Sequence, residues 1–331
     1  MQPFKLEQHR SKPLAPPSKG PGRPEPPPAL RNLAEHAGVQ FNGPEPWDIQ
    51  VHDPEVYSRI LAEGSLGFGE SYMHGLWDCE ALDELLHRLL SVNVDEHLGG
   101  WARLMLLGEA LRERLFNMQS RQRAFQVGER HYDMICRKLE LKPGERVLEI
   151  GCGWGGLAQH AAVNYGVEVV GITVSREQQH LARERCKGLP VRIDLVDYRD
   201  VEGLFDKVVS VGMFEHVGPK NYGIYLDTAL RVMRDDGLFL LHTIGNYKTL
   251  RTVDPWIERY IFPNGKVPSA AELATALNDR FVIEDWHNFG ADYDPTLMAW
   301  WQRFDAAWPT LKGRYDQLFY RMWRFYLLSC A

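Results

Sequence analysis

The segment Val147-Leu-Glu-Ile-Gly-Cys-Gly-Trp-Gly-Gly-Leu157 decides the fold class. It starts as a short apolar strand, continues through a run of glycines and opens a helical pattern. Glycines in this place allow a tight turn and let a ligand approach the backbone closely. The segment therefore predicts the first strand, turn and helix of a doubly wound α/β domain, with a ligand bound at the turn.

Short β patterns alternate with helical patterns on both sides of this segment. We expect helices over 156–165, 175–186 and 222–233, and strands over 146–150, 168–174, 191–196, 206–213, 237–243 and 281–286. Continuous apolar strands separated by helices are typical of a parallel sheet covered on both faces.

The part of the chain before this pattern differs in composition. Nine of the 20 prolines lie in the first 28 residues, together with five basic residues, so we expect a disordered tail over 1–29. Residues 30–126 are predicted to form a mainly helical domain, with one helix face made by the leucines at 82, 85, 86, 89 and 90 and a second helix at 101–111. The three glycines of 64–71 predict a turn there.

Composition excludes several classes of protein. The chain has 331 residues, 44% of them hydrophobic, and a formal net charge of -6, which argues against a nucleic-acid binder. Its five cysteines are scattered and never spaced as CxxC, so neither a disulfide framework nor a zinc site is expected. No apolar run approaches the roughly 20 residues that span a bilayer. We expect a cytoplasmic protein with no metal site.

The glycine turn itself is compatible with two ligands. Gly151, Gly153 and Gly156 fit the GxGxxG pattern of dinucleotide-binding domains. Gly151, Gly153 and Gly155 fit the GxGxG pattern of methyltransferases that use S-adenosylmethionine (SAM). The glycines alone leave both ligands open.

The residues around the turn favour SAM. An NAD site needs an acidic residue about 20 positions further on, to hold the ribose. The corresponding stretch, Gly171-Ile-Thr-Val-Ser175, has none. Glu149 precedes the first glycine by two residues, where methyltransferases place an acid that faces the amino-acid end of SAM. Thr173 and Gln178 are then expected to supply the polar contacts on the ribose side.

With these motifs the chain resembles the cyclopropane-fatty-acyl-phospholipid synthases, a bacterial family of SAM-dependent mycolic acid and cyclopropane synthases. The strings that carry the resemblance are 147–158, 171–179, 197–200, 211–222, 240–245, 253–256, 260–265 and 284–294. The resemblance implies a Rossmann-like SAM methyltransferase domain over 127–331, after a smaller, mainly helical N-terminal domain.

The resemblance also implies a reaction. In this family SAM donates a methylene group to the cis double bond of an unsaturated phospholipid acyl chain, through a carbocation that bound bicarbonate deprotonates. SAM would be contacted by Glu149, Gly151, Gly153, Gly155, Thr173, Gln178, Tyr198 and Arg199. Bicarbonate would be held by Glu215, His242, Tyr293 and the backbone of Ile244.

Some of these residues have a second interpretation. Cys330 matches a cysteine that is sometimes described as catalytic in the family, although the reaction has no covalent step that needs a thiol. Taken alone, His242 reads as a core histidine and Tyr293 as an aromatic residue near a helix cap. The aromatic residues between 300 and 326 either pack in a core or line an acyl channel.

The implied partners are membrane phospholipids, bound peripherally at the inner face of the membrane, and a second copy of the chain in a homodimer. The basic residues Arg112, Arg114, Arg121 and Arg123 either contact anionic headgroups or form a solvated helix face.

The chain departs from the family pattern in two places. A segment of several dozen residues that carries a SAM contact and a bicarbonate-binding cysteine is missing after His131-Tyr132-Asp133, and a final strand is missing after Ala331. We expect these departures to lower solubility and activity. The alternatives are a degenerate, non-catalytic relative that binds SAM or lipid, and another SAM-dependent lipid methyltransferase.

Overall fold

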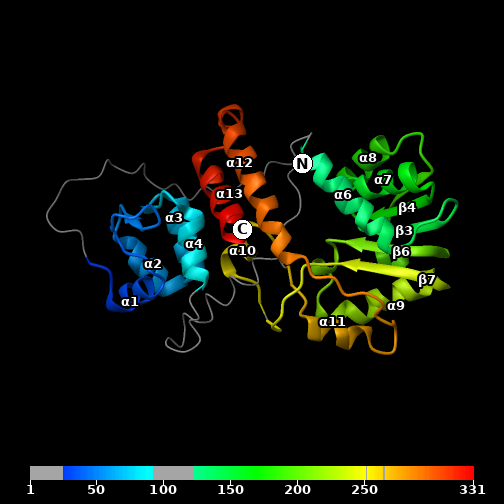
Figure 1. Ribbon diagram of the computed structural model, residues 1–331, viewed down its shortest axis with the longest axis horizontal. Helices are drawn as coiled ribbons and strands as arrows, with labels where there is room; N and C mark the ends of the chain where they lie inside the picture. Colours follow the sequence, from blue (N-terminus) through cyan, green and yellow to red (C-terminus); the bar gives the residue numbers. More distant parts are fainter. Residues whose placement is uncertain (1–24, 92–122, 251, 264) are drawn as a thin grey trace. The chain divides into compact units, whose positions relative to one another are not determined.

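The computed structural model describes residues 25–91, 123–250, 252–263 and 265–331, and contacts divide the chain into two compact units (Figure 1). Unit 1 comprises Met1–Leu115, Thr252–Pro263 and Phe289–Ala331. Unit 2 comprises Phe116–Arg251 and Asn264–Asn288. The two units are described separately.

Unit 2 contains a parallel sheet of five strands in the order β5-β4-β3-β6-β7. The strands are β3 (Arg146–Ile150), β4 (Glu168–Thr173), β5 (Val191–Leu195), β6 (Phe205–Val211) and β7 (Met233–His242). The order reverses direction between β3 and β6, as it does in doubly wound sheets. The predicted fold class and the first five predicted strands are confirmed.

Helices cover both faces of this sheet (Figure 1). One face carries α6 (Arg123–Lys138), α7 (Gly156–Tyr165) and α8 (Arg176–Arg185). The other carries α9 (Tyr222–Val232) and α11 (Ala270–Leu277). The short helices η2 (Tyr198–Asp200), η3 (Phe214–His216) and η4 (Pro219–Asn221) follow β5 and β6.

Neighbouring residues of each strand enter different cores because strand side chains alternate between the two faces. Val147 and Val169 pack with α6 and α7, whereas Leu148 and Val170 pack with α9. A strand buried on both sides needs apolar residues at every position, which explains the continuous apolar runs in the sequence.

The sixth predicted strand, over 281–286, is wrong. This segment is irregular, and Val282, Ile283 and Trp286 are 83%, 47% and 54% exposed. Within the described residues β7 is the last strand of the sheet, so the segment has no neighbouring strand to pair with. An apolar run becomes a strand only where such a ladder is available.

Unit 1 is mainly helical. Its described elements are a two-stranded antiparallel pair, β1 (Gln50–Val51) and β2 (Trp77–Asp78), the short η5 (Gly290–Asp292), and the helices α1 (Pro28–His36), α2 (Glu55–Glu63), α3 (Ser65–Met73), α4 (Leu82–Ser91), α10 (Pro255–Tyr260), α12 (Tyr293–Leu311) and α13 (Gln317–Cys330). The predicted leucine face is confirmed, because Leu82, Leu85, Leu86 and Leu89 are buried in α4.

The C-terminal helices belong to the core of unit 1. Phe325, Tyr326 and Leu327 of α13 share one apolar cluster with residues of α1 to α4. The expected division at 126 and 127 placed these helices with the sheet instead. That boundary falls inside α6, whereas most of the expected tail lies outside the described residues, and the domain limits stay a prediction.

The turn predicted over 64–71 is wrong, because α3 begins at Ser65. Gly64, with φ +62°, makes the break between α2 and α3, but the next two glycines lie inside the helix. A Cβ on Gly67 would overlap the carbonyl oxygen of Arg59, and one on Gly69 would lie 2.5 Å from the Trp256 ring. These two glycines therefore permit close packing and do not end a helix.

Several predictions fall outside the described residues: the helix at 101–111, the tail up to residue 24, the residues Arg112, Arg114 and Arg121, and the side chain of Arg123. Among the helices that are described, none is long and apolar enough to cross a membrane. All five cysteines are free and buried.

Candidate functional site

The glycine turn lies between β3 and α7. Gly151, Gly153 and Gly155 have φ angles of +82°, +51° and +73°, the left-handed region that favours glycine. A Cβ on Gly151 would lie 2.9 Å from the Met213 side chain, and one on Gly155 would lie 3.0 Å from Ala182. A Cβ on Gly153 would meet nothing within 4 Å. Gly151 and Gly155 are thus needed for close packing, because a Cβ there would clash. Of these three glycines, Gly153 alone faces open space that a ligand can occupy.

Gly156, which completes the dinucleotide pattern, serves the packing of two helices. A Cβ at this position would lie 2.5 Å from the hydroxyl oxygen of Tyr132 on α6. The fourth glycine therefore reflects the close approach of α6 and α7 and gives no support to a dinucleotide.

Glu149 is the last residue but one of β3 and is buried. Burial raises the pKa of this carboxyl to about 8, although a hydrogen bond from the backbone N–H of Ala158 favours its ionised form. Its Oε2 atom has no hydrogen-bond partner among the described residues. A buried carboxyl oxygen without a partner is costly, and a ligand at the turn that carries an N–H donor would satisfy it.

Thr173 and Gln178 lie at the end of β4 and the start of α8. The Thr173 hydroxyl donates to Oε1 of Gln178 at 2.7 Å and accepts from the backbone N–H of Ser175 at 3.1 Å. The two side chains therefore orient each other, and the amide nitrogen of Gln178 takes no part in that bond.

Tyr198 and Arg199 lie in η2, directly after β5. The Arg199 guanidinium binds both carboxylate oxygens of Asp197, at 2.8 and 2.7 Å, and this ion pair lowers the pKa of Asp197. The Tyr198 ring packs edge to face on Tyr225, with centroids 5.0 Å apart. Because Asp197 already binds the Arg199 guanidinium, we expect the ring of Tyr198, rather than Arg199, to contact a planar group such as adenine.

All eight residues predicted to contact SAM therefore lie at or shortly after the carboxyl ends of β3, β4 and β5, which are adjacent in the sheet. In open parallel sheets, ligands bind at this edge, beside the position where the strand order reverses.

Three of the residues predicted to hold bicarbonate, Glu215, His242 and Ile244, lie at or shortly after the ends of β6 and β7. Oε1 of Glu215, in η3, accepts a hydrogen bond of 2.8 Å from the backbone N–H of Ile244. His242 ends β7, two residues before Ile244, and lies opposite Val211 in the ladder. Glu215 is only 6% exposed, and its Oε2 atom has no hydrogen-bond partner among the described residues. The structure thus shows a hydrogen bond between Glu215 and the backbone of Ile244, and His242 is the last residue of β7, the strand that precedes Ile244.

His131 is a residue of this region to which the sequence pattern assigns no role. Its imidazole, on α6, contacts the His242 ring edge to face, with centroids 5.0 Å apart. Burial, and then the neighbouring His131, lower the pKa of His242 to about 4, and burial lowers the pKa of His131. The only sequence signal was its place in the His131-Tyr132-Asp133 string, since helix periodicity does not reveal which strand end a residue faces.

Tyr293 and Cys330 belong to unit 1. Tyr293 begins α12, and its ring stacks on Phe289 with centroids 6.3 Å apart. Cys330 is buried in the apolar cluster at the end of α13, which gives it the surroundings of a packing residue. The roles expected for these two residues stay predictions.

The aromatic residues of α12 and α13 pack mainly on one another. Phe304 stacks on Tyr320 with ring centroids 5.7 Å apart, and Trp308 lies 4.9 Å from the same ring. An apolar cavity of about 100 Å³ in unit 1 is bordered by Phe325 but by no other member of this aromatic group. The contacts favour core packing for most of these residues.

No group of three or more His, Cys, Asp or Glu side chains among the described residues could hold a metal ion.

Comparisons with known proteins place these features in a family. A family model described as mycolic acid cyclopropane synthetase matches residues 119–331. The cyclopropane-fatty-acyl-phospholipid synthase of Escherichia coli is 49% identical over 337 residues, covering 90% of this chain and 87% of that protein. The tuberculostearic acid methyltransferase UfaA1 of Mycobacterium tuberculosis is 31% identical, covering 84% and 78%.

A solved structure of the mycolic acid cyclopropane synthase CmaA1, complexed with SAH and CTAB, has the same fold. It aligns with a TM-score of 0.57 at 24% identity and covers 67% of this chain and 87% of the other.

The alignment with the E. coli protein also contains an internal difference. It extends over 337 positions but takes in 90% of the 331 residues, about 298, which leaves about 39 positions where this chain has no residue. The segment expected to be missing after Asp133 stays a prediction.

Proposed function

Because the chain belongs to the mycolic acid cyclopropane synthetase family, we propose that it transfers a methylene group from SAM to the cis double bond of unsaturated phospholipid acyl chains. The product is a cyclopropane fatty acyl chain. The observation that carries this proposal is the 49% identity, over 90% of the chain, to a cyclopropane-fatty-acyl-phospholipid synthase.

The carboxyl edge of β3, β4 and β5 fits SAM. When bound, SAM supplies the carbon atom that is transferred. Gly153 leaves open space beside the backbone, and the buried carboxyl of Glu149 offers an oxygen to the ammonium end of the ligand. The Tyr198 ring offers a face for adenine. An NAD ribose would need a carboxylate after β4, where Thr173 stands instead.

We further infer that bicarbonate binds at Glu215. When bound, it serves as the base that removes a proton from the newly added methyl group. Two anions side by side repel each other, but bicarbonate carries an O–H that can donate to a carboxylate. Oε2 of Glu215, which has no partner among the described residues, supports such a bond. The N–H of Ile244 holds the other carboxylate oxygen, so Ile244 fixes the direction in which Glu215 points.

His242 complements this arrangement. Its lowered pKa keeps the imidazole neutral at pH 7, so it can donate one hydrogen bond to an anion without adding a positive charge to the site. A carbocation formed near this point has to be kept away from water, and the burial of Glu215 contributes to that exclusion.

We propose peripheral association with the inner face of the membrane, because the double bond lies in a lipid acyl chain and no described helix could span the bilayer. The homodimer stays a prediction. The internal gap of about 39 positions favours one alternative, a relative that binds SAM but makes little product.

The test is the ratio of cyclopropane to monoene phospholipid, measured by mass spectrometry after reaction with SAM, with and without bicarbonate. We expect product that depends on bicarbonate, at a low rate that rises when the segment expected to be missing after Asp133 is grafted in from the E. coli relative. Loss of product in Glu215→Gln, with SAM affinity unchanged, would support the base site. A methyl-branched product would point to another lipid methyltransferase, and SAM binding without product in the grafted chain would point to a degenerate relative.

A further inference from the structure

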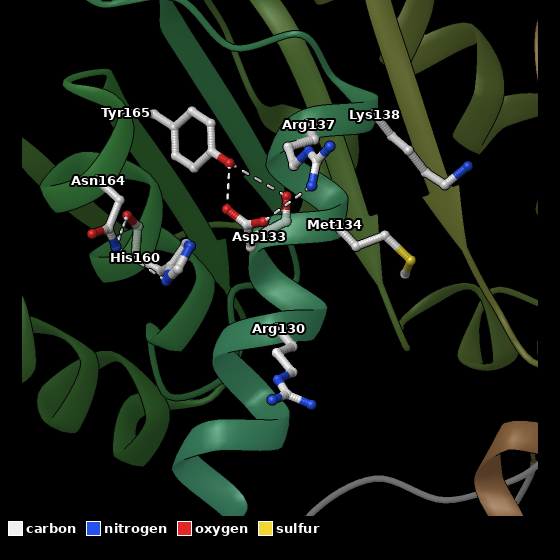
Figure 2. Close-up of a pocket in the computed structure, with 8 residues that line it drawn as sticks. All are labelled: Arg130, Asp133, Met134, Arg137, Lys138, His160, Asn164 and Tyr165. Atoms are coloured by element: carbon white, nitrogen blue, oxygen red, sulfur yellow. Dashed lines mark hydrogen bonds and ion pairs between the residues drawn. The ribbon is translucent and has the colours of Figure 1, made fainter.

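A polar groove lies between α6 and α7, on the face of the sheet that these helices cover (Figure 2). It has a volume of about 1120 Å³ and is bordered by three residues of α7 and five of α6: Arg130, Asp133, Met134, Arg137 and Lys138. None of the residues assigned to SAM or bicarbonate borders it. A ligand bound in this groove would therefore be separate from the SAM and bicarbonate sites proposed above.

The α6 residues share one face of the helix. Arg130, Met134 and Arg137 are spaced by four and three residues, which brings them to the same side. Ile135 and Leu139 point to the opposite side and are buried against the sheet. Packing thus fixes which side of α6 faces outward, and that side carries the cations.

The groove has three cationic side chains and one carboxylate. Asp133 is held by the Tyr165 hydroxyl, which donates at 2.6 Å, and burial together with Asp133 raises the pKa of Tyr165 to about 12, so it remains a donor. The nearest guanidinium nitrogen of Arg137 is 3.9 Å from the Asp133 carboxylate, which is long for an ion pair, and the Arg137 side chain is 77% exposed. Its guanidinium therefore keeps the capacity to bind a second anion.

The other two cations differ in their partners. Lys138 pairs with Asp285, which lies outside the groove. Arg130 is exposed and makes no ion pair with any residue that the structure describes. Figure 2 shows its side chain extended from α6, one helical turn away from Asp133. Arg130 and Arg137 are thus two guanidinium groups on one ridge with little competition from carboxylates.

We propose that this groove binds the phosphate of an anionic phospholipid headgroup and thereby docks unit 2 on the membrane surface. The proposal rests on the proposed function, which requires a lipid substrate. A guanidinium presents paired N–H donors that match phosphate oxygens. The volume exceeds what a bare phosphate needs and is that of a small-molecule site.

The charge of the rest of the chain supports a local docking site. With a formal net charge of -6, the protein as a whole is not attracted to an anionic leaflet. A concentrated group of cations then determines which side approaches the lipid. Met134, an apolar side chain between the cations, suits the boundary between headgroups and acyl chains.

The experiment compares two double variants with the same change in charge. In Arg130→Gln/Arg137→Gln both guanidinium groups of the ridge are removed. In the matched control, Arg231→Gln/Arg234→Gln, two exposed cations at the end of α9 and the start of β7 are removed, and α9 covers the opposite face of the sheet from α6. Each protein is sedimented with vesicles of phosphatidylglycerol and phosphatidylcholine in equal parts, and with vesicles of phosphatidylcholine alone.

Each cation near an anionic surface contributes about fivefold to vesicle partition, so the groove variant should bind the anionic vesicles roughly 25-fold more weakly than the parent. The control should change by less than about twofold, because its cations lie away from the docking side. Binding to phosphatidylcholine alone should be weak for all three proteins.

Three outcomes would overturn the proposal. The groove variant could bind anionic vesicles as well as the parent, or the control could lose as much as the groove variant, which would mean that total charge decides. Inorganic phosphate at the concentration of vesicle phosphate could displace the parent, which would mean that the groove takes free phosphate. If the double variant does not fold, the single Arg130→Gln change tests the same point with an expected loss of about fivefold.

Failure of the proposed function would look different. A chain that makes no cyclopropane product, or that binds no SAM by calorimetry, would leave the difference between the two variants in vesicle binding intact.

Discussion

The imidazole rings of His131 and His242 meet edge to face, with centroids 5.0 Å apart, one carried by α6 and the other by the end of β7. Burial is the larger cause of the low pKa of His242, and the proximity of a second imidazole adds to it. The two rings therefore form a neutral pair at pH 7, where α6 meets the end of β7.

Acid should weaken the fold through this pair. In the unfolded chain His242 takes up a proton near pH 6.5, whereas in the fold it does so only near pH 4. The unfolded state therefore gains protons first, and the free energy of unfolding should fall by about 3 kcal/mol between these two pH values. Urea denaturation of the parent and of His242→Gln over this range measures the effect, which should be smaller in the variant. Equal pH dependence of the two proteins would contradict it.

Removing His131 should shift the titration of its neighbour. In His131→Asn the neighbouring positive charge can no longer form, so the pKa of His242 should rise, while burial keeps it below 6.5. The His242 ring proton, followed by NMR as the pH is lowered, reports this directly. An unchanged titration of His242 in the variant would show that His131 does not contribute to its low pKa.

Glu149 should give the opposite pH dependence. Its carboxyl is ionised above pH 4.5 in the unfolded chain but only above about pH 8 in the fold, so stability declines as the pH rises through this window. Glu149→Gln has no such group, and at pH 8 it should be more stable than the parent by about 3 kcal/mol or more. The same change should weaken SAM binding. A parent protein whose unfolding free energy is flat from pH 5 to pH 8 would contradict the first expectation.

Gly153→Ala should reduce SAM affinity. The φ angle of +51° strains any residue with a Cβ by about 1 to 2 kcal/mol, and the new methyl group would project into the open space at the turn. We expect an affinity loss of about tenfold by calorimetry. Gly188→Ala is the matched control, because Gly188 has φ +82°, equally open surroundings and a position between α8 and β5. It should lose stability but not affinity, and unchanged affinity in a folded Gly153→Ala protein would refute the contact.

Gly69→Ala should destabilise unit 1 by about 1 to 3 kcal/mol, because the added Cβ would lie 2.5 Å from the buried Trp256 ring. In an open helix the same change would stabilise by up to about 1 kcal/mol. Gly313→Ala, where a Cβ would meet nothing within 4 Å, is the control and should be close to neutral. Urea unfolding followed by tryptophan fluorescence distinguishes the two. Equal stability of both variants would show that the Trp256 ring moves aside freely.

The sheet could be predicted from the sequence because its signal is local. Strands buried on both faces need unbroken apolar runs, and the glycine turn has a fixed place after the first of them. The same reasoning failed at 281–286, where the apolar pattern was present but a partner strand was not. Whether a strand forms depends on pairing that a local pattern does not report.

The remaining differences also depend on distant contacts. Gly67 and Gly69 look like turn residues until the backbone of α2 and the ring of Trp256 are placed beside them. His131 gains its importance from a residue more than a hundred positions away in the chain. Glu215 and His242 could be singled out only because a family resemblance supplied their roles, since a single acid or histidine on a buried strand more often serves core hydrogen bonding than catalysis.

Unit 1 is assembled from chain segments that are far apart, and this has a consequence for synthesis on the ribosome. The leucine face of α4 is complete once residue 91 has been made, but Phe325 and Leu327, which share its apolar cluster, emerge more than 230 residues later. At typical rates of about 5 to 20 residues per second, that interval lasts on the order of ten seconds or more. The sheet of unit 2, whose described strands end at residue 242, can form during this wait, while the N-terminal helices present uncovered leucines to chaperones and to other nascent chains.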